Sequence, residues 1–114
     1  FLNRYQGKRF NSPNDLAVAR SGAIYFTDPP YGLAGLDKSP AKELKTNGVY
    51  RRAPDGQVSL IDDTLTFPNG IALAPDEAVL YVSNSDPGRP IIRSYNLGTD
   101  GLPKSSATSS MQRA

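Results

Sequence analysis

The feature of this sequence that most constrains its fold is a block that occurs twice. The segment PNDLAVARSGAIYFTD covers residues 13–28, and PNGIALAPDEAVLYVSN covers residues 68–84. With one extra residue in the second copy, both share an opening Pro-Asn pair, a short apolar run and a tyrosine. Each copy predicts a turn followed by two short strands. Four-stranded units that recur every 40 to 55 residues or so are typical of β-propeller blades, although two unrelated turn-and-strand segments would also give this pattern.

Short apolar runs and turn sequences continue after each copy, and no long segment has helical periodicity. Pro54-Asp55-Gly56 is a turn sequence, because proline presets φ, Asp caps backbone N–H groups and glycine accepts positive φ. Pro75-Asp76-Glu77 is read in the same way. We expect an all-β chain of about two four-stranded antiparallel blades. The predicted strands cover residues 16–19, 23–27, 49–53, 58–61, 71–74, 79–83 and 91–97.

Two segments depart from this rhythm. Residues 29–47 predict a long loop, with a helical turn over 38–45 as an alternative, and loops of this length in compact domains are often functional. Residues 104–114, KSSATSSMQRA, are rich in serine and lack a strand pattern. We therefore assign residues 1–103 to the propeller fragment and predict that residues 104–114 are disordered or foreign to the fold.

The composition excludes several kinds of chemistry and partner. The 114 residues contain no Cys and no His, which rules out disulfides, thiolate metal sites, a Ser-His-Asp triad and His-ligated zinc within them. The net charge of +2 with no basic run predicts no nucleic-acid partner. No apolar stretch approaches the roughly 18 residues of a membrane span, and no secretory signal opens the chain. We expect a soluble protein, cytoplasmic or periplasmic or secreted, of undecided oligomeric state.

The two Pro-Asn pairs contain the candidate site. In a propeller the innermost strands line the central channel, so equivalent residues at the starts of these strands converge near the axis. Asn14 and Asn69 would then offer two amide oxygens to one point, and a hard cation such as Ca²⁺ takes six to eight oxygen ligands. Asp15, beside Asn14, is the nearest candidate for a base or a water-positioning group. Ordinary turns are the alternative, because Asn favours turn positions.

Three stretches carry a resemblance to a known family: RFNSPNDLAVARSGAIYFTDPPYGL, NGVYRRAPDGQVSLI and FPNGIALAPDEAVLYVSNSD. The part from about Tyr5 to Leu102 resembles the gluconolactonase/regucalcin-like (senescence marker protein) family. The resemblance implies a six-bladed β-propeller with a divalent cation, usually Ca²⁺, on its axis, and hydrolysis of sugar lactones or related esters. It implies that Asn69 is a metal ligand and that Asn14 binds the metal or the substrate. Asp15 is the candidate catalytic residue and Tyr31 a candidate substrate-binding residue at the pocket mouth.

Departures from the family pattern limit this prediction. The family's carboxylate ligands, a Glu in the first blade and an Asp in a later one that acts as base or nucleophile, have no counterpart in this chain. We therefore expect an internal fragment of about two blades from a calcium-dependent lactonase, and we expect the isolated fragment to be inactive. The alternatives are a non-catalytic propeller that binds a ligand or calcium, and an inactive gene fragment.

Overall fold

The computed structural model describes residues 4–11, 13, 15–29, 38, 42–44 and 46–110, and the regular elements within them are ten β-strands. Strands β3 to β9 fall on the seven predicted segments. The bounds are β1 Arg4–Tyr5, β2 Lys8–Arg9, β3 Leu16–Val18, β4 Ile24–Thr27, β5 Val49–Arg52, β6 Val58–Asp62, β7 Pro68–Leu73, β8 Val79–Asn84, β9 Ile91–Leu97 and β10 Pro103–Ser110. This described part of the chain contains no helix that is long and apolar enough to cross a membrane.

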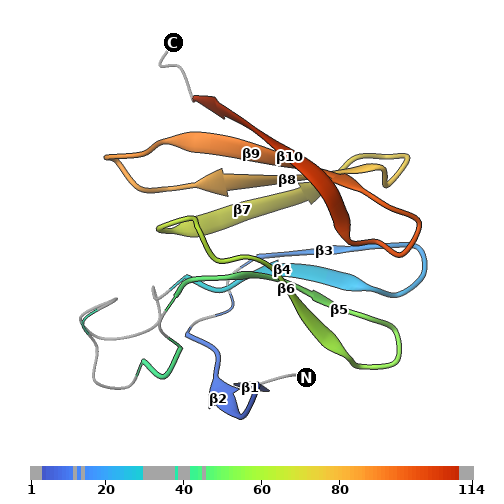
Figure 1. Cartoon of the computed structure of the whole chain (residues 1–114), viewed down its shortest axis with the longest axis horizontal. Coiled ribbons are helices and arrows are strands. Elements are labelled where there is room, and N and C mark those ends of the chain that lie inside the picture. Colours follow the sequence, from blue (N-terminus) through green and yellow to red (C-terminus); the bar gives the residue numbers. More distant parts are fainter. Residues whose placement is uncertain are drawn as a thin grey trace.

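The strands form two four-stranded antiparallel sheets in plain sequence order. Strands β3 to β6 make the first sheet, β7 to β10 make the second, and β1 pairs with β2 in a separate hairpin. Figure 1 shows the sheets side by side, with β3 and β7, the first strand of each, as neighbours. This is the arrangement of two successive propeller blades with their first strands innermost. The prediction of two four-stranded blades, each opening with one copy of the repeat, is confirmed.

The predicted turn residues act as their chemistry requires. Gly56 has a φ of 96° and donates its N–H to the carbonyl of Ala53 at 2.8 Å, while Asp55 Oδ1 accepts the N–H of Gln57 at 2.9 Å. In the turn between β7 and β8, Asp76 Oδ1 accepts the N–H of Ala78 at 3.0 Å. These side-chain contacts close the β5–β6 and β7–β8 hairpins.

The main core lies between the two sheets. Along β8, Leu80 and Val82 are fully buried whereas Tyr81 is exposed, because successive side chains of a strand point to opposite faces. The buried face of the second sheet packs against aliphatic and tyrosine side chains of the first, and this burial of apolar surface holds the sheets together. The cluster comprises Ala19, Ala23, Tyr25, Val49, Leu65, Leu80, Val82, Ile91 and Tyr95.

Residues near the N-terminus cover the outer face of the first sheet. Phe10 packs edge-on against Phe26 and Tyr50, with ring centroids 5.2 and 5.1 Å apart. Tyr5, from the β1–β2 hairpin, packs against Tyr50 at 5.1 Å. This aromatic cluster anchors the N-terminal segment on the sheet, and the sequence pattern did not predict the hairpin.

The prediction of an unstructured tail is wrong for residues 104–110, which form most of β10. This strand pairs antiparallel with β9. Its side chains after Pro103 are all exposed, so both faces carry polar residues and no apolar alternation marks the strand in the sequence. Hydroxyl groups support the pairing: Thr108 Oγ1 accepts a hydrogen bond from Arg93 Nε at 3.0 Å, and Ser105 Oγ accepts one from Asn96 Nδ2 at 2.9 Å.

Candidate functional site

Two of the four predicted site residues lie in the described part of the chain, and the structure places them on or beside neighbouring strands. Asp15 immediately precedes β3, and Asn69 is the second residue of β7. Their strands are neighbours, and hydrogen bonds described below connect the two segments. Asn14 and Tyr31 lie outside the described residues, as does most of the predicted loop, so their roles stay predictions.

Asn69 and Gly70 form a β-bulge at the start of β7. Pro68 pairs with Asn84, but the next paired residues are Ile71 and Val82. Asn69 and Gly70 therefore lie opposite one residue, Ser83. A bulge removes its residues from the regular ladder and changes the direction of their side chains, which is why bulges are frequent beside active sites.

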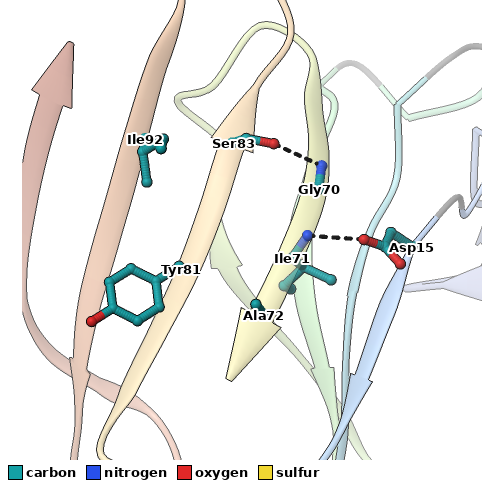
Figure 2. Close-up of a pocket in the computed structure, with 7 residues that line it drawn as sticks. All are labelled: Asp15, Gly70, Ile71, Ala72, Tyr81, Ser83 and Ile92. Atoms are coloured by element: carbon teal, nitrogen blue, oxygen red, sulfur yellow. Dashed lines mark hydrogen bonds between the residues drawn. The ribbon is translucent and has the colours of Figure 1, made fainter. Parts of the chain in front are cut away.

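Side chains at or next to the ends of β3, β4 and β8 form hydrogen bonds with the backbone at this bulge. Thr27 Oγ1, at the end of β4, donates to the Asn69 carbonyl at 2.8 Å. Ser83 Oγ accepts the N–H of Gly70 at 3.0 Å. Asp15 Oδ2 accepts the N–H of Ile71 at 3.0 Å; Figure 2 shows these last two contacts on either side of β7. The bulge is thus fixed by both sheets.

Asp15 joins the inner strands of the two sheets. Its Oδ1 accepts the N–H of Leu16 at 2.9 Å, while its Oδ2 accepts that of Ile71. Its carbonyl accepts the N–H of Thr27 at 3.1 Å. The side chain is exposed at one end of a shallow cavity of about 300 Å³ that runs along β7 and β8. Both carboxylate oxygens therefore have backbone donors.

The amide of Asn69 has a defined orientation. Its Nδ2 donates to Ser85 Oγ at 3.1 Å, and the residue is half-buried. Ser85 is itself fixed, because its backbone N–H donates to the carbonyl of Phe67 at 2.9 Å. Neither Ser83 nor Ser85 carried a signal in the sequence, since both contacts depend on how β7 and β8 align.

Asn11 organises the same end of the sheets and was also missed. This buried residue donates its backbone N–H to Asp28 Oδ2 at 2.8 Å. Its Nδ2 lies 2.9 Å from Asn47 Oδ1 and 3.1 Å from the carbonyl oxygens of Asp28 and Thr46. Asn47 Nδ2 in turn donates to the carbonyl of Thr66 at 2.7 Å. These bonds connect the segments that precede β3, β5 and β7.

The donors at this end of the sheets are those that a hard cation prefers. Asp15 and Asn69 contribute carboxylate and amide oxygens from neighbouring inner strands, and the sequence contains neither His nor Cys. Among the described residues no group of three or more Asp or Glu side chains lies close enough to hold a metal ion. The oxygen donors thus fit part of a coordination shell.

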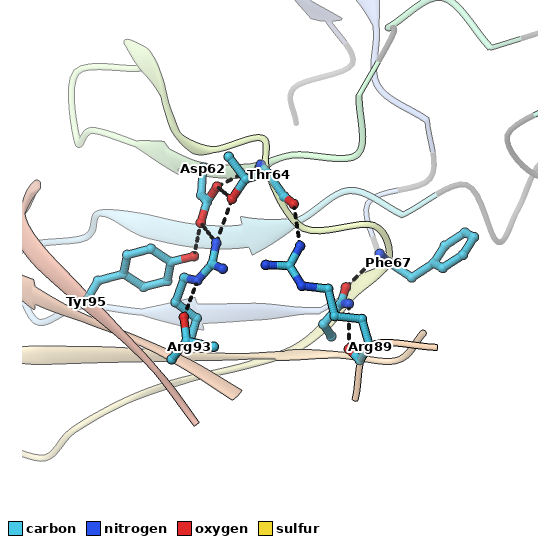
Figure 3. Close-up of polar contacts among 8 residues, drawn as sticks. Asp62, Thr64, Phe67, Arg89, Arg93 and Tyr95 are labelled. Atoms are coloured by element: carbon cyan, nitrogen blue, oxygen red, sulfur yellow. Dashed lines mark hydrogen bonds and ion pairs between the residues drawn. The ribbon is translucent and has the colours of Figure 1, made fainter. Parts of the chain in front are cut away.

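A second polar cluster, shown in Figure 3, joins β6 to β9. Asp62 Oδ2 accepts hydrogen bonds from Arg93 Nη1 at 2.9 Å and from Tyr95 Oη at 2.6 Å. Its Oδ1 accepts the N–H and the hydroxyl of Thr64 at 2.8 and 2.6 Å. The side chains of Asp62 and Arg93 are only 9% and 11% exposed. This ion pair is therefore shielded from solvent and connects the two sheets.

The titration properties of this cluster indicate a structural role. Burial raises the pKa of Asp62, but hydrogen bonds from Thr64, Tyr95 and Arg93 outweigh it and hold that pKa below its usual value of 3.8. Burial, followed by the hydrogen bond to Asp62, raises the pKa of Tyr95. At neutral pH the Asp62 carboxylate is ionised and accepts the hydrogen bond, while the Tyr95 phenol is neutral and donates it.

The fold consists of two adjacent propeller blades. A cluster of polar residues with oxygen donors lies where their inner strands begin. The sequence matches the SMP-30/Gluconolactonase/LRE-like region over residues 1–112, and the chain belongs to this family. The match includes β10.

Named relatives agree with this family. The chain is 59% identical over 104 residues to a gluconolactonase of Zymomonas mobilis, covering 91% of this chain and 29% of that protein. It is 37% identical to lactonohydrolase oryL of Aspergillus oryzae, covering 80% of this chain and 21% of that protein. A solved gluconolactonase from Xanthomonas campestris superposes with a TM-score of 0.77 at 43% identity, covering 93% of this chain and 36% of that structure. The chain thus spans about a third or less of these relatives.

Proposed function

We propose that this chain supplies two blades of a metal-dependent propeller hydrolase that acts on sugar lactones or related esters. Its membership of the gluconolactonase family supports the reaction class. The observation that carries the proposal for the site is the link between Asp15 and the bulge that contains Asn69. It joins the starts of two inner strands, where an axial site requires its ligands.

The residues present fit a hard divalent cation, since every donor is an oxygen, and we propose Ca²⁺ on the strength of the family resemblance. Asn69, together with Asn14, would hold the cation through the amide oxygens. When bound, such a cation polarises the lactone carbonyl as a Lewis acid. That chemistry needs no histidine, and the sequence has none.

The chain's own residues have distinct proposed tasks. The bulge sets the direction of the Asn69 side chain. Asn14 and Tyr31 would bind the substrate. Asp15 keeps the two inner strands in register, because its carboxylate oxygens accept N–H groups from both. Both carboxylate oxygens of Asp15 thus hold backbone N–H groups, which is a structural task. We therefore place the proton acceptor on a carboxylate outside this chain.

Hydrolysis of gluconolactone by the complete protein tests the proposal. Asn69→Ala should lower kcat/KM by at least tenfold, in line with the loss of a metal ligand. Asn96→Ala is the matched control. Like Asn69, Asn96 donates an amide N–H to a serine hydroxyl in the second sheet, but it lies on β9, away from the proposed site. Equal rates in wild type and Asn69→Ala would overturn the assignment.

The engagement of both Asp15 oxygens also favours a second candidate, a propeller that binds a ligand or calcium without turnover. Such a protein would bind Ca²⁺ through Asn69 and bind lactones without opening them. Cation binding by a wild-type protein that shows no hydrolysis would select this function.

A further inference from the structure

The bulge in β7 has two serine contacts that strand pairing does not require. In a regular ladder, backbone groups pair with backbone groups, and side chains are not needed. At Asn69 and Gly70 the pairing with β8 is interrupted, and two hydroxyl groups from the end of β8 occupy the gap. Ser83 contacts the backbone and Ser85 contacts the side chain.

Ser83 determines the position of the bulge backbone. Its Oγ accepts the Gly70 N–H at 3.0 Å. A Cβ at position 70 would lie 2.7 Å from this oxygen, closer than nonbonded contacts allow. The close approach therefore depends on glycine at this position, immediately after the ligand candidate Asn69.

Ser85 determines the direction of the Asn69 amide. The Nδ2 and Oδ1 atoms are bonded to one trigonal carbon, so anchoring Nδ2 on Ser85 Oγ also fixes the direction of Oδ1. Oδ1 is the atom that an amide offers to a cation. Groups that orient a ligand in this way commonly change metal affinity when they are removed.

We infer that Ser85, with Ser83, is a positioning residue for the Asn69 ligand in the proposed cation site. Ser83 holds the bulge and Ser85 holds the amide, so both act on the cation site through Asn69. This inference rests on the proposed function, because it concerns the same site.

Substitution of the two serines in the complete protein tests the inference. Ser85→Ala should weaken Ca²⁺ binding by about 10- to 100-fold, measured by calorimetric titration, as expected for loss of a group that orients a ligand. Ser85→Thr retains the hydroxyl and should restore an affinity within a few-fold of wild type. In the cation-free protein, Ser83→Ala should accelerate amide hydrogen exchange at Gly70 by about tenfold.

Ser94→Ala is the matched control. Ser94 lies on β9 of the same sheet, is half-buried like Ser83, and makes no side-chain hydrogen bond to the described residues. If Ser85 positions the ligand, Ser85→Ala should bind Ca²⁺ more weakly than Ser94→Ala. The two variants should have similar Tm values. Unchanged Ca²⁺ affinity in Ser85→Ala, with an active wild type, would overturn the inference alone. A wild type with neither cation binding nor lactone hydrolysis would overturn the proposed function and this inference together.

Discussion

The hydroxyl of Tyr95 provides the most direct probe of how the two sheets are held together. This residue is 3% exposed, and its hydroxyl donates to Asp62 Oδ2 at 2.6 Å across the interface. Tyr95→Phe removes that donor and leaves the ring in place. The Asp62 carboxylate keeps its bonds to Arg93 and Thr64, so it does not become unpaired.

The structure sets the size of the expected effect. A hydrogen bond to a charged group contributes about 1.5–3 kcal/mol, and the bonds that Asp62 retains place the loss near 2 kcal/mol. For a protein of roughly 300 residues this corresponds to a fall in Tm of about 3 °C. Differential scanning calorimetry of the complete protein measures it directly.

Tyr81→Phe is the control for this experiment. Tyr81 is 44% exposed on the opposite face of the second sheet, and its hydroxyl makes no hydrogen bond to the described residues. Its loss should change the Tm by less than about 1–2 °C, as surface substitutions do. Equal shifts in the two variants would refute the argument that the Asp62 cluster stabilises the contact between the sheets.

Three further predictions follow from other contacts. Gly70→Ala should cost about 1–3 kcal/mol, because its Cβ would meet Ser83 Oγ, and adding Ser83→Ala should cost less than the sum of the two single effects in urea denaturation. The lowered pKa of Asp62 adds stability that is present above its unfolded value of 3.8 and is lost as the pH falls through the folded value. Asp62→Asn should therefore flatten the dependence of Tm on pH below about pH 5, and an unaltered slope in thermal scans would contradict this. The isolated 114-residue chain should aggregate in light scattering, because Val18 and Tyr81 on its two outer faces are 59% and 44% exposed. It should also lack lactonase activity, because we place the proton acceptor on a carboxylate outside this chain. A cooperative thermal transition with a high midpoint would count against the expected aggregation.

The parts of the fold that sequence could predict are those encoded locally. The repeated Pro-Asn blocks and the Pro-Asp-Gly turn lie within short segments, and the structure places them at the first strand of each sheet and in the β5–β6 hairpin. Strand β10 was missed because its serine and threonine side chains are exposed on both faces, so its pairing depends on backbone bonds to β9.

The site was only partly predictable for a related reason. Asn69 stood out because the Pro-Asn pair recurs with the repeat, and Asp15 stood out because it lies beside Asn14. The bulge, however, is a property of the register between β7 and β8, and Ser85 becomes relevant only when that register is known. The bond from Asp15 to Ile71 joins residues that are 56 positions apart, and only the packing of one sheet on the other creates it.

Calorimetric titration of Ca²⁺ into the complete protein tests the central claim most directly. Wild type and Asn96→Ala should bind one cation with the same affinity, and Asn69→Ala should bind it at least tenfold more weakly. An Asn69→Ala protein with wild-type affinity would show that the end of β7 is not part of a cation site.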